Sequence, residues 1–566
     1  MNLSAHSSNE ATVGLTAVPQ PEEMERDEVR RSTEVTDEGG SSFKHKFESG
    51  SNMLQRFKRE IFDDGTKEQS STDDSSQQSS ASLQTVNENL TEGSLEAPDN
   101  PPDGGYGWVC CLCVTLIMFS TWGANSGFGV FLAYYFNNGV FEGASKYDYA
   151  LVAGMTVAFG QGLAPFAMFL TRILGCKPPM YTGVVMLFCG FLLASFAKKL
   201  WQLYLTQGVL VGVSIALLYA PATTVIPGWF LKKRSLAIGM SLIGTGAGGV
   251  TYSVSVNKLI QDSGDQTWAL RMMAISCTIT CIVATVLIKP RNPPKPTYFN
   301  SWSEVIREFK LIFSTRVARI YSVDLVAVWF VFALFGYNLM VFTLSPYAVA
   351  KGLSAHQASI LTTCLNAAQT VGRPIMGYLG DRFGRINTTA LLTTVLSTFM
   401  FAFWIPCHNF IQLLMFSICI GSCVGVGNVM STVLVADVVS PADFLPAWGL
   451  VNSLGAPFLL ECEIIAQALT DTKNPSNPYL HTQIFAGLCF VCALVLMLVY
   501  RELRVRNCLQ EQLESLPNPR MQYSTDQEQQ KNYKNSASEK EYFECAEILT
   551  ANPINFFRRM FYPTKI

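Results

Sequence analysis

The sequence predicts an all-α membrane protein in which twelve transmembrane helices form two halves of six. The first supporting observation is composition: 49% of the 566 residues are hydrophobic and 15% are charged, whereas soluble domains carry about 25% charged residues. The second is that apolar stretches of about twenty residues, long enough to cross a bilayer as helices, recur from Trp108 to Tyr500.

Residues 1–100 are rich in Ser, Asp, Glu and Gln and contain few aromatic residues. A stretch such as STDDSSQQSSAS cannot bury enough apolar surface to offset its ordering entropy, so we expect a disordered cytoplasmic tail. No signal peptide opens the chain, so the first membrane helix is expected to direct the protein to the membrane and to remain in the product.

The apolar stretches divide into an N-terminal half at 101–288 and a C-terminal half at 320–500, with a cytoplasmic connector at 289–319 and a cytoplasmic tail at 501–566. The predicted spans are 108–136, 148–171, 180–197, 201–228, 235–257 and 268–288, then 320–347, 356–379, 388–407, 410–437, 447–469 and 482–500. Lys and Arg gather in alternate loops, which predicts that both termini are cytoplasmic. Halves repeated about an axis along the membrane normal are typical of transporters.

The segment GYLGDRFGR, residues 377–385, follows the eighth span on the predicted cytoplasmic side. Gly377 and Gly384 permit a tight turn, while Asp381, Arg382 and Arg385 can cap helix ends and pair across the halves. Such pairs can break and re-form as the halves rock, so we expect a gate here; the alternative is a plain positive-inside loop. The corresponding loop of the first half, FLTRILGCKP, lacks the acid, so a gate there must be weaker or built differently.

The segment DGGYGW, residues 103–108, leads into the first span. Gly104 and Gly105 allow a close approach of the backbone. We expect Asp103 to favour the N-terminus of helix one electrostatically and Trp108 to lie at the membrane interface.

The segment WFLKKRSLAIGMSLIGTGAGG, residues 229–249, leads into the fifth span and carries the basic cluster Lys232, Lys233 and Arg234, which we assign to the gate. Its GTGAGG matches a nucleotide-binding pattern that needs a preceding strand. Because GTGAGG lies within an apolar span, we expect its glycines to serve tight helix packing instead.

These segments carry a family resemblance. GYLGDRFGR resembles the loop motif of the major facilitator superfamily, and residues 103–108 and 229–249 resemble the two signatures of the monocarboxylate transporter family. STWGANSG and LYLTQGVLVG look most like the fungal branch, the monocarboxylate permease homologues. The resemblance covers about residues 101–500 and neither tail. It implies the major facilitator fold and secondary transport of a small organic solute, monocarboxylate-like or another small polar metabolite, by alternating access.

Arg373 lies within the eighth span, where a charge is costly and suggests function. Asn366, Gln369, Thr370 and Arg373 are spaced to share one helical face, which we expect to line a polar cavity. GRPIMG resembles the family's arginine that is associated with binding the substrate carboxylate, and a guanidinium suits that role because it stays charged and presents a bidentate fork. The alternative is a structural arginine that snorkels inward or pairs with an acid.

The chain departs from the family pattern at two positions. Animal proton-coupled members carry an aspartate one turn before that arginine, where this chain has Gln369, and a lysine in helix one at the position of Ser126. Neither side chain takes up a proton near neutral pH. We therefore do not expect simple proton–lactate symport; a neutral or larger substrate, or uncoupled transport, gains weight.

Other polar residues in the spans are further candidates. Glu461 and Glu463 in span eleven can carry a coupling proton or hold a cation; alternatively both lie near the outer end and are partly wet. Asn125 in span one and Gln207 in span four are expected on the substrate path, although a single polar residue is more often a helix–helix hydrogen bond.

Three cysteines, Cys110, Cys111 and Cys113, open the first span. They cannot present one metal-binding face, because neighbouring helical residues point about 100° apart. No zinc-ligand spacing occurs elsewhere, so we expect neither a metal nor a cofactor. The C-terminal NFFRRMFYPTKI either contacts the inner leaflet or is disordered.

Several function classes lack their motifs. HExxH, GxSxG and the ATP-binding GxxxxGK[ST] are absent, which argues against an enzyme or an ATP-driven pump. The alternative function is a non-transporting nutrient sensor on a transporter fold. We expect a monomeric transport unit with a small-molecule substrate, the lipid bilayer and cytoplasmic regulators of the tails as partners, but no nucleic acid. The plasma membrane is the expected location, with the vacuolar membrane as the alternative.

Overall fold

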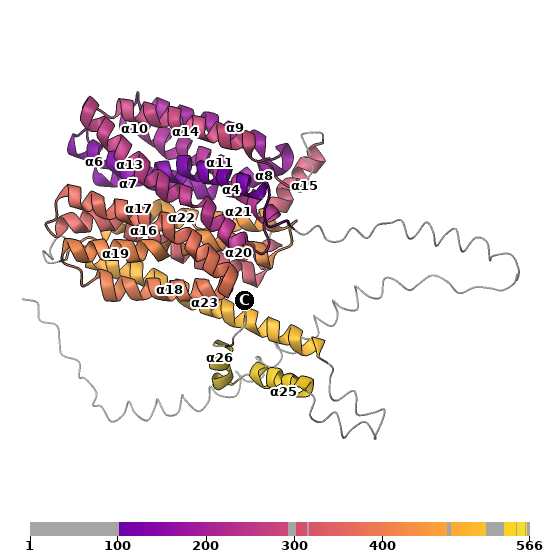
Figure 1. Ribbon diagram of the computed structural model, residues 1–566. Helices are drawn as coiled ribbons and strands as arrows, with labels where there is room; N and C mark the ends of the chain where they lie inside the picture. Colours follow the sequence, from indigo (N-terminus) through magenta and orange to yellow (C-terminus); the bar gives the residue numbers. More distant parts are fainter. Residues whose placement is uncertain are drawn as a thin grey trace, which may run out of the picture. The chain divides into compact units, whose positions relative to one another are not determined.

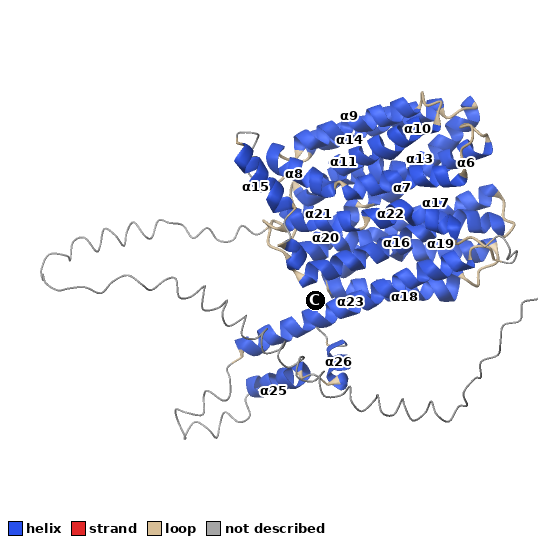
Figure 2. Ribbon diagram, turned by 180° about the vertical axis from the view of Figure 1, so that it is seen from behind, coloured by secondary structure: helices blue, strands red, loops and turns tan. Residues whose placement is uncertain are grey.

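The computed structural model describes residues 101–291, 301–313, 316–471, 477–516, 537–550, 552–560 and 562. Within these ranges the regular secondary structure is helical throughout (Figure 1, Figure 2). The predicted tail at residues 1–100 lies outside the described residues.

The N-terminal half follows the six predicted spans. Its helices are α4 (Gly107–Met118), η1 (Phe119–Gly123), α5 (Ala124–Ser126) and α6 (Phe128–Asn137); α7 (Lys146–Gly162) and α8 (Ala164–Leu174); α9 (Lys177–Ala194); α10 (Leu200–Leu203), η2 (Tyr204–Leu210) and α11 (Val211–Trp229); α12 (Arg234–Ser241) and α13 (Ile243–Ser263); and α14 (Thr267–Leu287). The segments η1 and η2 are π-helical, a geometry that often marks functional sites.

The connector contains α15 (Trp302–Ile312) and η3 (Val317–Arg319). The C-terminal half contains α16 (Tyr321–Ala350); α17 (Ala355–Phe383); α18 (Arg385–Phe399) and η4 (Met400–Trp404); α19 (Phe410–Val424) and α20 (Val426–Val438); α21 (Phe444–Leu454) and α22 (Ala456–Ala468); and α23 (Leu480–Ser515). All twelve predicted spans therefore fall in helices.

Nine helical stretches among the described residues are long and apolar enough to cross a membrane, and the bent pair Tyr147–Gly162 and Ala164–Leu174 makes a tenth. The two other predicted spans are α12–α13 and α17, which are interrupted by Gly, Thr, Asn, Gln and Arg. These two helical stretches pack against each other across the two halves. The two helical stretches with polar interruptions are therefore those that meet at the interface between the halves.

Glycines allow the helices to cross closely. A Cβ atom at Gly244 would overlap the carbonyl oxygen of Thr115, and one at Gly248 would overlap that of Phe119. The prediction that GTGAGG serves helix packing is consistent with this crossing. Between the halves, Gly154 lies against Leu460 in the same way.

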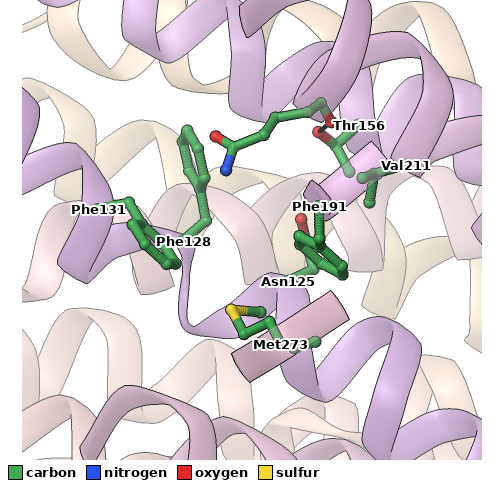
Figure 3. Close-up of a pocket in the computed structure, with 9 residues that line it drawn as sticks. Asn125, Phe128, Phe131, Thr156, Phe191, Val211 and Met273 are labelled. Atoms are coloured by element: carbon green, nitrogen blue, oxygen red, sulfur yellow. Dashed lines mark hydrogen bonds between the residues drawn. The ribbon is translucent and has the colours of Figure 1, made fainter. Parts of the chain in front are cut away.

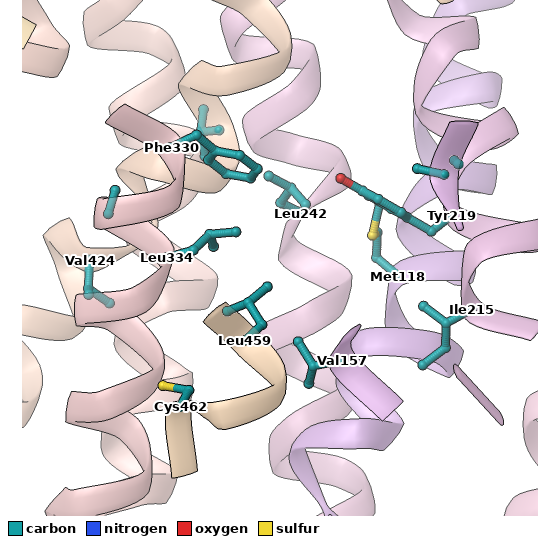
Figure 4. Packing of buried hydrophobic residues seen from close by; sticks show 14 of the residues in the cluster. Met118, Val157, Ile215, Tyr219, Leu242, Phe330, Leu334, Val424, Leu459 and Cys462 are labelled. Atoms are coloured by element: carbon teal, nitrogen blue, oxygen red, sulfur yellow. The ribbon is translucent and has the colours of Figure 1, made fainter. Parts of the chain in front are cut away.

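Buried apolar residues from both halves form one continuous cluster. Figure 4 shows Leu242 and Tyr219 of the N-terminal half near Phe330 and Leu459 of the C-terminal half. The halves are thus packed against each other along the path that an alternating-access mechanism must open.

The chain does not end its ordered structure at residue 500. α23 continues to Ser515, and α25 (Ala537–Leu549) and α26 (Pro553–Met560) follow. Of the segment NFFRRMFYPTKI, the part up to Met560 belongs to the helix α26, and residues 561 and 563–566 lie outside the described residues.

Candidate functional site

Arg373 is buried at the interface between the halves, with 1% of its surface exposed. Its Nη1 donates to the carbonyl oxygen of Leu242 at 2.8 Å, and its Nη2 donates to Oε1 of Gln369 at 2.6 Å. Leu242 stands at the break between α12 and α13 in the opposite half. One side chain therefore joins the two halves at the break in the fifth span.

The charge of Arg373 is not neutralised by an acid among the described residues, since no carboxylate oxygen there lies within 4.0 Å of it. Its Nε has no hydrogen-bond partner in the same ranges, and neither has Nε2 of Gln369. Tyr337 of α16 adds a weak hydrogen bond of 3.4 Å to Oε1 of Gln369. A buried cation whose partners are all neutral is costly, so the alternative of a structural pair with an acid is not what the structure shows.

Asn366 and Ser126 approach each other on either side of Gly249. A Cβ atom at Gly249 would lie 3.2 Å from Cβ of Ser126 and 3.3 Å from the amide group of Asn366. Asn366 is on α17 and Ser126 on α5, so the two residues lie next to Gly249 from opposite halves. Asn366 is about two turns from Arg373 on α17.

Asn125 and Gln207 form a separate group inside the N-terminal half. They line a cavity of about 20 Å³ together with Thr156 and apolar side chains (Figure 3), and that volume suits a single water molecule. Oε1 of Gln207 is buried without a hydrogen-bond partner in the described ranges. The expected substrate path therefore consists of two groups, and the structure does not join Asn125 and Gln207 to Arg373.

The two acids of span eleven lie in different environments. Glu463 is 5% exposed and its Oε2 has no hydrogen-bond partner among the described residues, whereas Glu461 is exposed. Because residues two apart on a helix point to different sides, only Glu463 has the buried position that the coupling hypothesis requires. The alternative that both acids are partly wet stays a prediction for Glu461, whose side chain is exposed.

The predicted gate occupies one end of the bundle, which we term the basic end and define by Lys232, Lys233, Arg234, Arg385 and Arg501. Asp381 at the end of α17 accepts hydrogen bonds from the backbone N–H groups of Ser235 at 3.2 Å and Leu236 at 2.9 Å. These groups open α12 in the opposite half, so a carboxylate caps a helix N-terminus across the interface.

Two arginines converge on one acid beside that cap. Asp437 at the end of α20 pairs with Arg385 at 2.5 Å and with Arg234 at 2.8 Å. Arg385 also donates to the carbonyl oxygen of Leu231 at 2.6 Å. Burial lowers the pKa of the Arg234 guanidinium, and the carboxylate of Asp437 opposes this by favouring the charged form.

Asp437 belongs to this charged cluster and was missed by the sequence analysis. The sequence feature that could have identified it is an acid at the end of the tenth predicted span, in VADVVSPAD. This acid is next to the one loop with little basic charge. Its role depends on Arg234, 203 positions away, which no local pattern reveals.

The remaining motif residues have local contacts. Arg382 donates to the hydroxyl of Tyr378 within the same helix, and Lys232 and Lys233 are exposed. A Cβ atom at Gly377 would overlap the carbonyl oxygen of Ser235. Gly384 has φ = 101°, which favours glycine at this turn.

The expectation for Asp103 was wrong. No acid stands in the first turn of α4; instead Oδ1 of Asp103 accepts from the backbone N–H groups of Leu231, Lys232 and Lys233 at 2.8, 2.8 and 3.0 Å. The three orphan donors before α12 attract the carboxylate more strongly than the start of its own helix does. The two predicted signature segments therefore form one structural unit.

Aromatic packing joins the same two segments. Trp108 lies edge-on to Phe230 with ring centroids 4.8 Å apart. A Cβ atom at Gly107 would lie 2.9 Å from Cβ of Trp229, so glycine is required there. Gly105 has φ = 60°, which favours glycine. The positive φ at Gly105 and the close approach at Gly107 together explain the glycine-rich turn.

Replacing Asp103 with alanine is expected to lower the thermal unfolding temperature of the purified protein by several degrees. Hydrogen bonds to a charged group contribute about 1.5–3 kcal/mol each, and three donors lose their acceptor. Asp103→Asn retains Oδ1 and should show less than half of the loss. Differential scanning fluorimetry in detergent measures both variants, and an unfolding temperature for Asp103→Ala equal to the wild type would contradict the assigned contact.

The loop without an acid in the first half has its partner in the connector. Arg172 donates to Oε2 of Glu308 on α15 at 2.5 Å, and Glu308 is 6% exposed. Phe309 packs edge-on against Phe169, with centroids 5.4 Å apart. Because α15 also contacts α21, the connector helix bridges both halves. The contact at this loop is thus built differently from the one at GYLGDRFGR.

Comparison with known protein families gives a match over most of the chain. The profile of the Major Facilitator Superfamily matches residues 110–355 and 331–520.

Two curated proteins of Saccharomyces cerevisiae are similar in sequence. The uncharacterized transporter ESBP6 is 52% identical over 489 residues, which cover 85% of this chain and 72% of that protein. The probable transporter MCH2 is 32% identical over 389 residues, which cover 69% and 81%.

Among solved structures, the outward conformation of the transporter FucP aligns with a TM-score of 0.52 at 15% identity, covering 70% of this chain and 99% of that one. The human organic anion transporter MFSD10 aligns with a TM-score of 0.51 at 14% identity, covering 70% and 100%. These similarities show the fold.

Proposed function

The chain belongs to the Major Facilitator Superfamily and is a secondary transporter of a small solute, and from this premise we propose that its substrate is a small organic anion, of the monocarboxylate class, bound through Arg373. The observation that carries the proposal is the buried guanidinium without an acidic partner among the described residues. A carboxylate supplies the missing negative charge and a planar pair of acceptors.

The hydrogen bonds of Arg373 suit a residue that must change partners. Its Nη1 holds a backbone carbonyl of the opposite half, and its Nε has no hydrogen-bond partner among the described residues. A carboxylate that replaces the Leu242 carbonyl would bind to α17 and release the contact between the halves. Substrate binding and rearrangement of the halves are then linked by one side chain.

The basic end is the proposed cytoplasmic end, because Lys and Arg favour that side. There Asp381 and Asp437 close the gate across the halves. Opening toward the cytoplasm requires both contacts to break, while α15 leaves its site between α8 and α21. The proposed location is the plasma membrane.

Uptake into proteoliposomes tests the proposal directly. Purified protein is assayed against a panel of carboxylates, polyols and vitamins, with and without a pH gradient. Saturable uptake of a carboxylate that unlabelled carboxylates compete for is the expected result. Uptake of polyols alone would refute the anionic substrate, and binding without flux would favour the sensor.

Uptake is expected to change less than about threefold between external pH 5.5 and 7.5, because Gln369 and Ser126 have no proton to exchange in that range. Glu463→Gln and the exposed Glu461→Gln form a matched pair for this measurement. Any residual pH dependence should disappear in the first variant and persist in the second. A steep rise in uptake at acidic pH that survives both substitutions would contradict this account.

A further inference from the structure

The C-terminal helices are attached to the part of α23 that extends beyond the bundle. Val505 and Leu509 of α23 form a buried apolar cluster with Cys545 and Ile548 of α25. Both α25 and α26 contact α23. α25 and α26 are therefore packed against the rest of the structure at the basic end.

A buried polar anchor fixes α26. Arg559 is 3% exposed, and its Nε donates to Oε1 of Glu502 at 2.6 Å. Its Nη1 donates to the carbonyl oxygens of Ile548 and Thr550. Arg501 donates in turn to the carbonyl oxygen of Arg559 at 3.0 Å. The anchor holds α26 beside the first turn of α23 after Tyr500.

The same anchor sets the level of α26 along the bundle. Nε of Arg501 donates to Oδ1 of Asn387 at 2.9 Å, and Asn387 lies in the first turn of α18. In Figures 1 and 2, α26 runs across the direction of α18. Thus α26 lies close to the first turn of α18 and to the part of α23 that follows Tyr500, and we expect lipid headgroups at this level.

The face of α26 opposite the anchor is apolar and exposed. Ile554 is 67% exposed, Phe557 62% and Phe556 39%. Ile554, Phe557 and the exposed Arg558 share one face by their spacing. Large apolar residues at this density on an eight-residue helix are poorly suited to water, but they suit the boundary between headgroups and acyl chains.

Charges of both signs surround this face. α25 carries four glutamates. Arg558 pairs with Glu547 at 2.8 Å and Arg559 with Glu502 at 2.6 Å, so the arginines left without an acidic partner among the described residues are on α23. α26 carries Arg558 and Arg559 and no acid, and the first turns of α23 beyond Tyr500 carry three arginines against one glutamate, namely Arg501, Arg504, Arg506 and Glu502. Basic residues close to a membrane surface are attracted by anionic lipids.

We propose that α26 is an interfacial helix that inserts Ile554, Phe556 and Phe557 into the anionic lipid leaflet at the basic end, held in place by the Arg559–Glu502 pair. The inference is independent of the proposed substrate. It gives the C-terminal segment a partner, the bilayer surface, and joins that contact to α18 two residues after the gate residue Arg385.

Site-specific photo-crosslinking in the full chain tests this. The protein is made with p-benzoylphenylalanine in place of Phe557, reconstituted in nanodiscs that contain phosphatidylserine, irradiated and analysed by mass spectrometry. Lipid adducts are expected at position 557. Gln510 is an exposed residue of α23 and lies about 13 Å along that helix from Arg501. The same probe in place of Gln510 is the matched control and should give at least tenfold fewer adducts.

Two further arms address the anchor and the charge. Arg559→Gln combined with the probe at 557 should lower the adduct yield several-fold, and nanodiscs of phosphatidylcholine alone should do the same. Absence of lipid adducts at 557, or adducts to protein only, would overturn the proposal. Equal yields in phosphatidylcholine would overturn the role of charge, and an unchanged yield in Arg559→Gln would overturn the role of the ion pair. Uptake by each variant shows that it is folded.

Discussion

Arg373→Gln is expected to lower solute uptake by about 100-fold while the amount of protein in the membrane stays within about twofold of the wild type. Loss of one partner of a buried charged pair costs roughly 3 kcal/mol, and every 1.4 kcal/mol is about tenfold. Glutamine keeps polar atoms near the Leu242 carbonyl but has neither the charge nor the fork. Initial uptake rates in proteoliposomes, normalised to protein by immunoblot, give the comparison.

Arg373→Lys separates charge from geometry in the same assay. Lysine retains the positive charge but cannot bond a carboxylate and Gln369 in the planar arrangement of a guanidinium. We expect it to keep some uptake with a raised KM, in contrast to Arg373→Gln. Wild-type uptake by Arg373→Gln would remove this residue from the substrate path and leave it a structural link between the halves.

Asp437→Asn is expected to lower uptake by about tenfold and to loosen the basic end. The substitution removes the acid shared by Arg234 and Arg385, and an unpaired buried arginine costs several kcal/mol at most sites. The gate should then open more often, because its closed state has lost two ion pairs. Hydrogen exchange with mass spectrometry should show faster exchange in residues 231–238 than in the wild type.

Two variants control for that result. Asp437→Glu retains the charge and should recover most of the uptake and the slow exchange. Arg382→Gln alters the same motif, but the contacts of the Arg382 side chain in the described part of the chain, with Tyr378 and the ring of Phe383, stay within its own helix, so its uptake should stay above half of the wild type. If Asp437→Asn exchanged and transported like the wild type, the assigned gate would be wrong.

The positions of the helices followed from local composition, whereas the function of the charged residues did not. Apolar length predicted the nine stretches, and the bent pair that makes a tenth, which are long and apolar enough to cross a bilayer among the described residues, because a bilayer demands about twenty apolar residues for each helix. The glycine-rich GTGAGG was placed in helix packing for the same local reason. Asp103, by contrast, sits beside its own helix in sequence but binds donors 128 to 130 positions away.

The candidate path shows the same division. Periodicity placed Asn366, Gln369 and Arg373 on one face of α17, and their contacts with α12, α13 and α5 agree with that face. It could not separate Asn125 and Gln207 from them, since periodicity says which face a residue occupies but not which helix lies opposite. Nor could it distinguish buried Glu463 from exposed Glu461.

The sequence by itself thus determined the class of protein, the positions of the helices and the unusual arginine in the eighth predicted span. Each of these depends on residues close together in the chain. Only the tertiary structure decided that Arg373 lacks an acid among the described residues, that Asp437 pairs with Arg234 and Arg385, and that Arg559 anchors the C-terminal helix. Those facts depend on pairs of charges from distant segments, whose energies are set by burial and by distance rather than by neighbouring sequence.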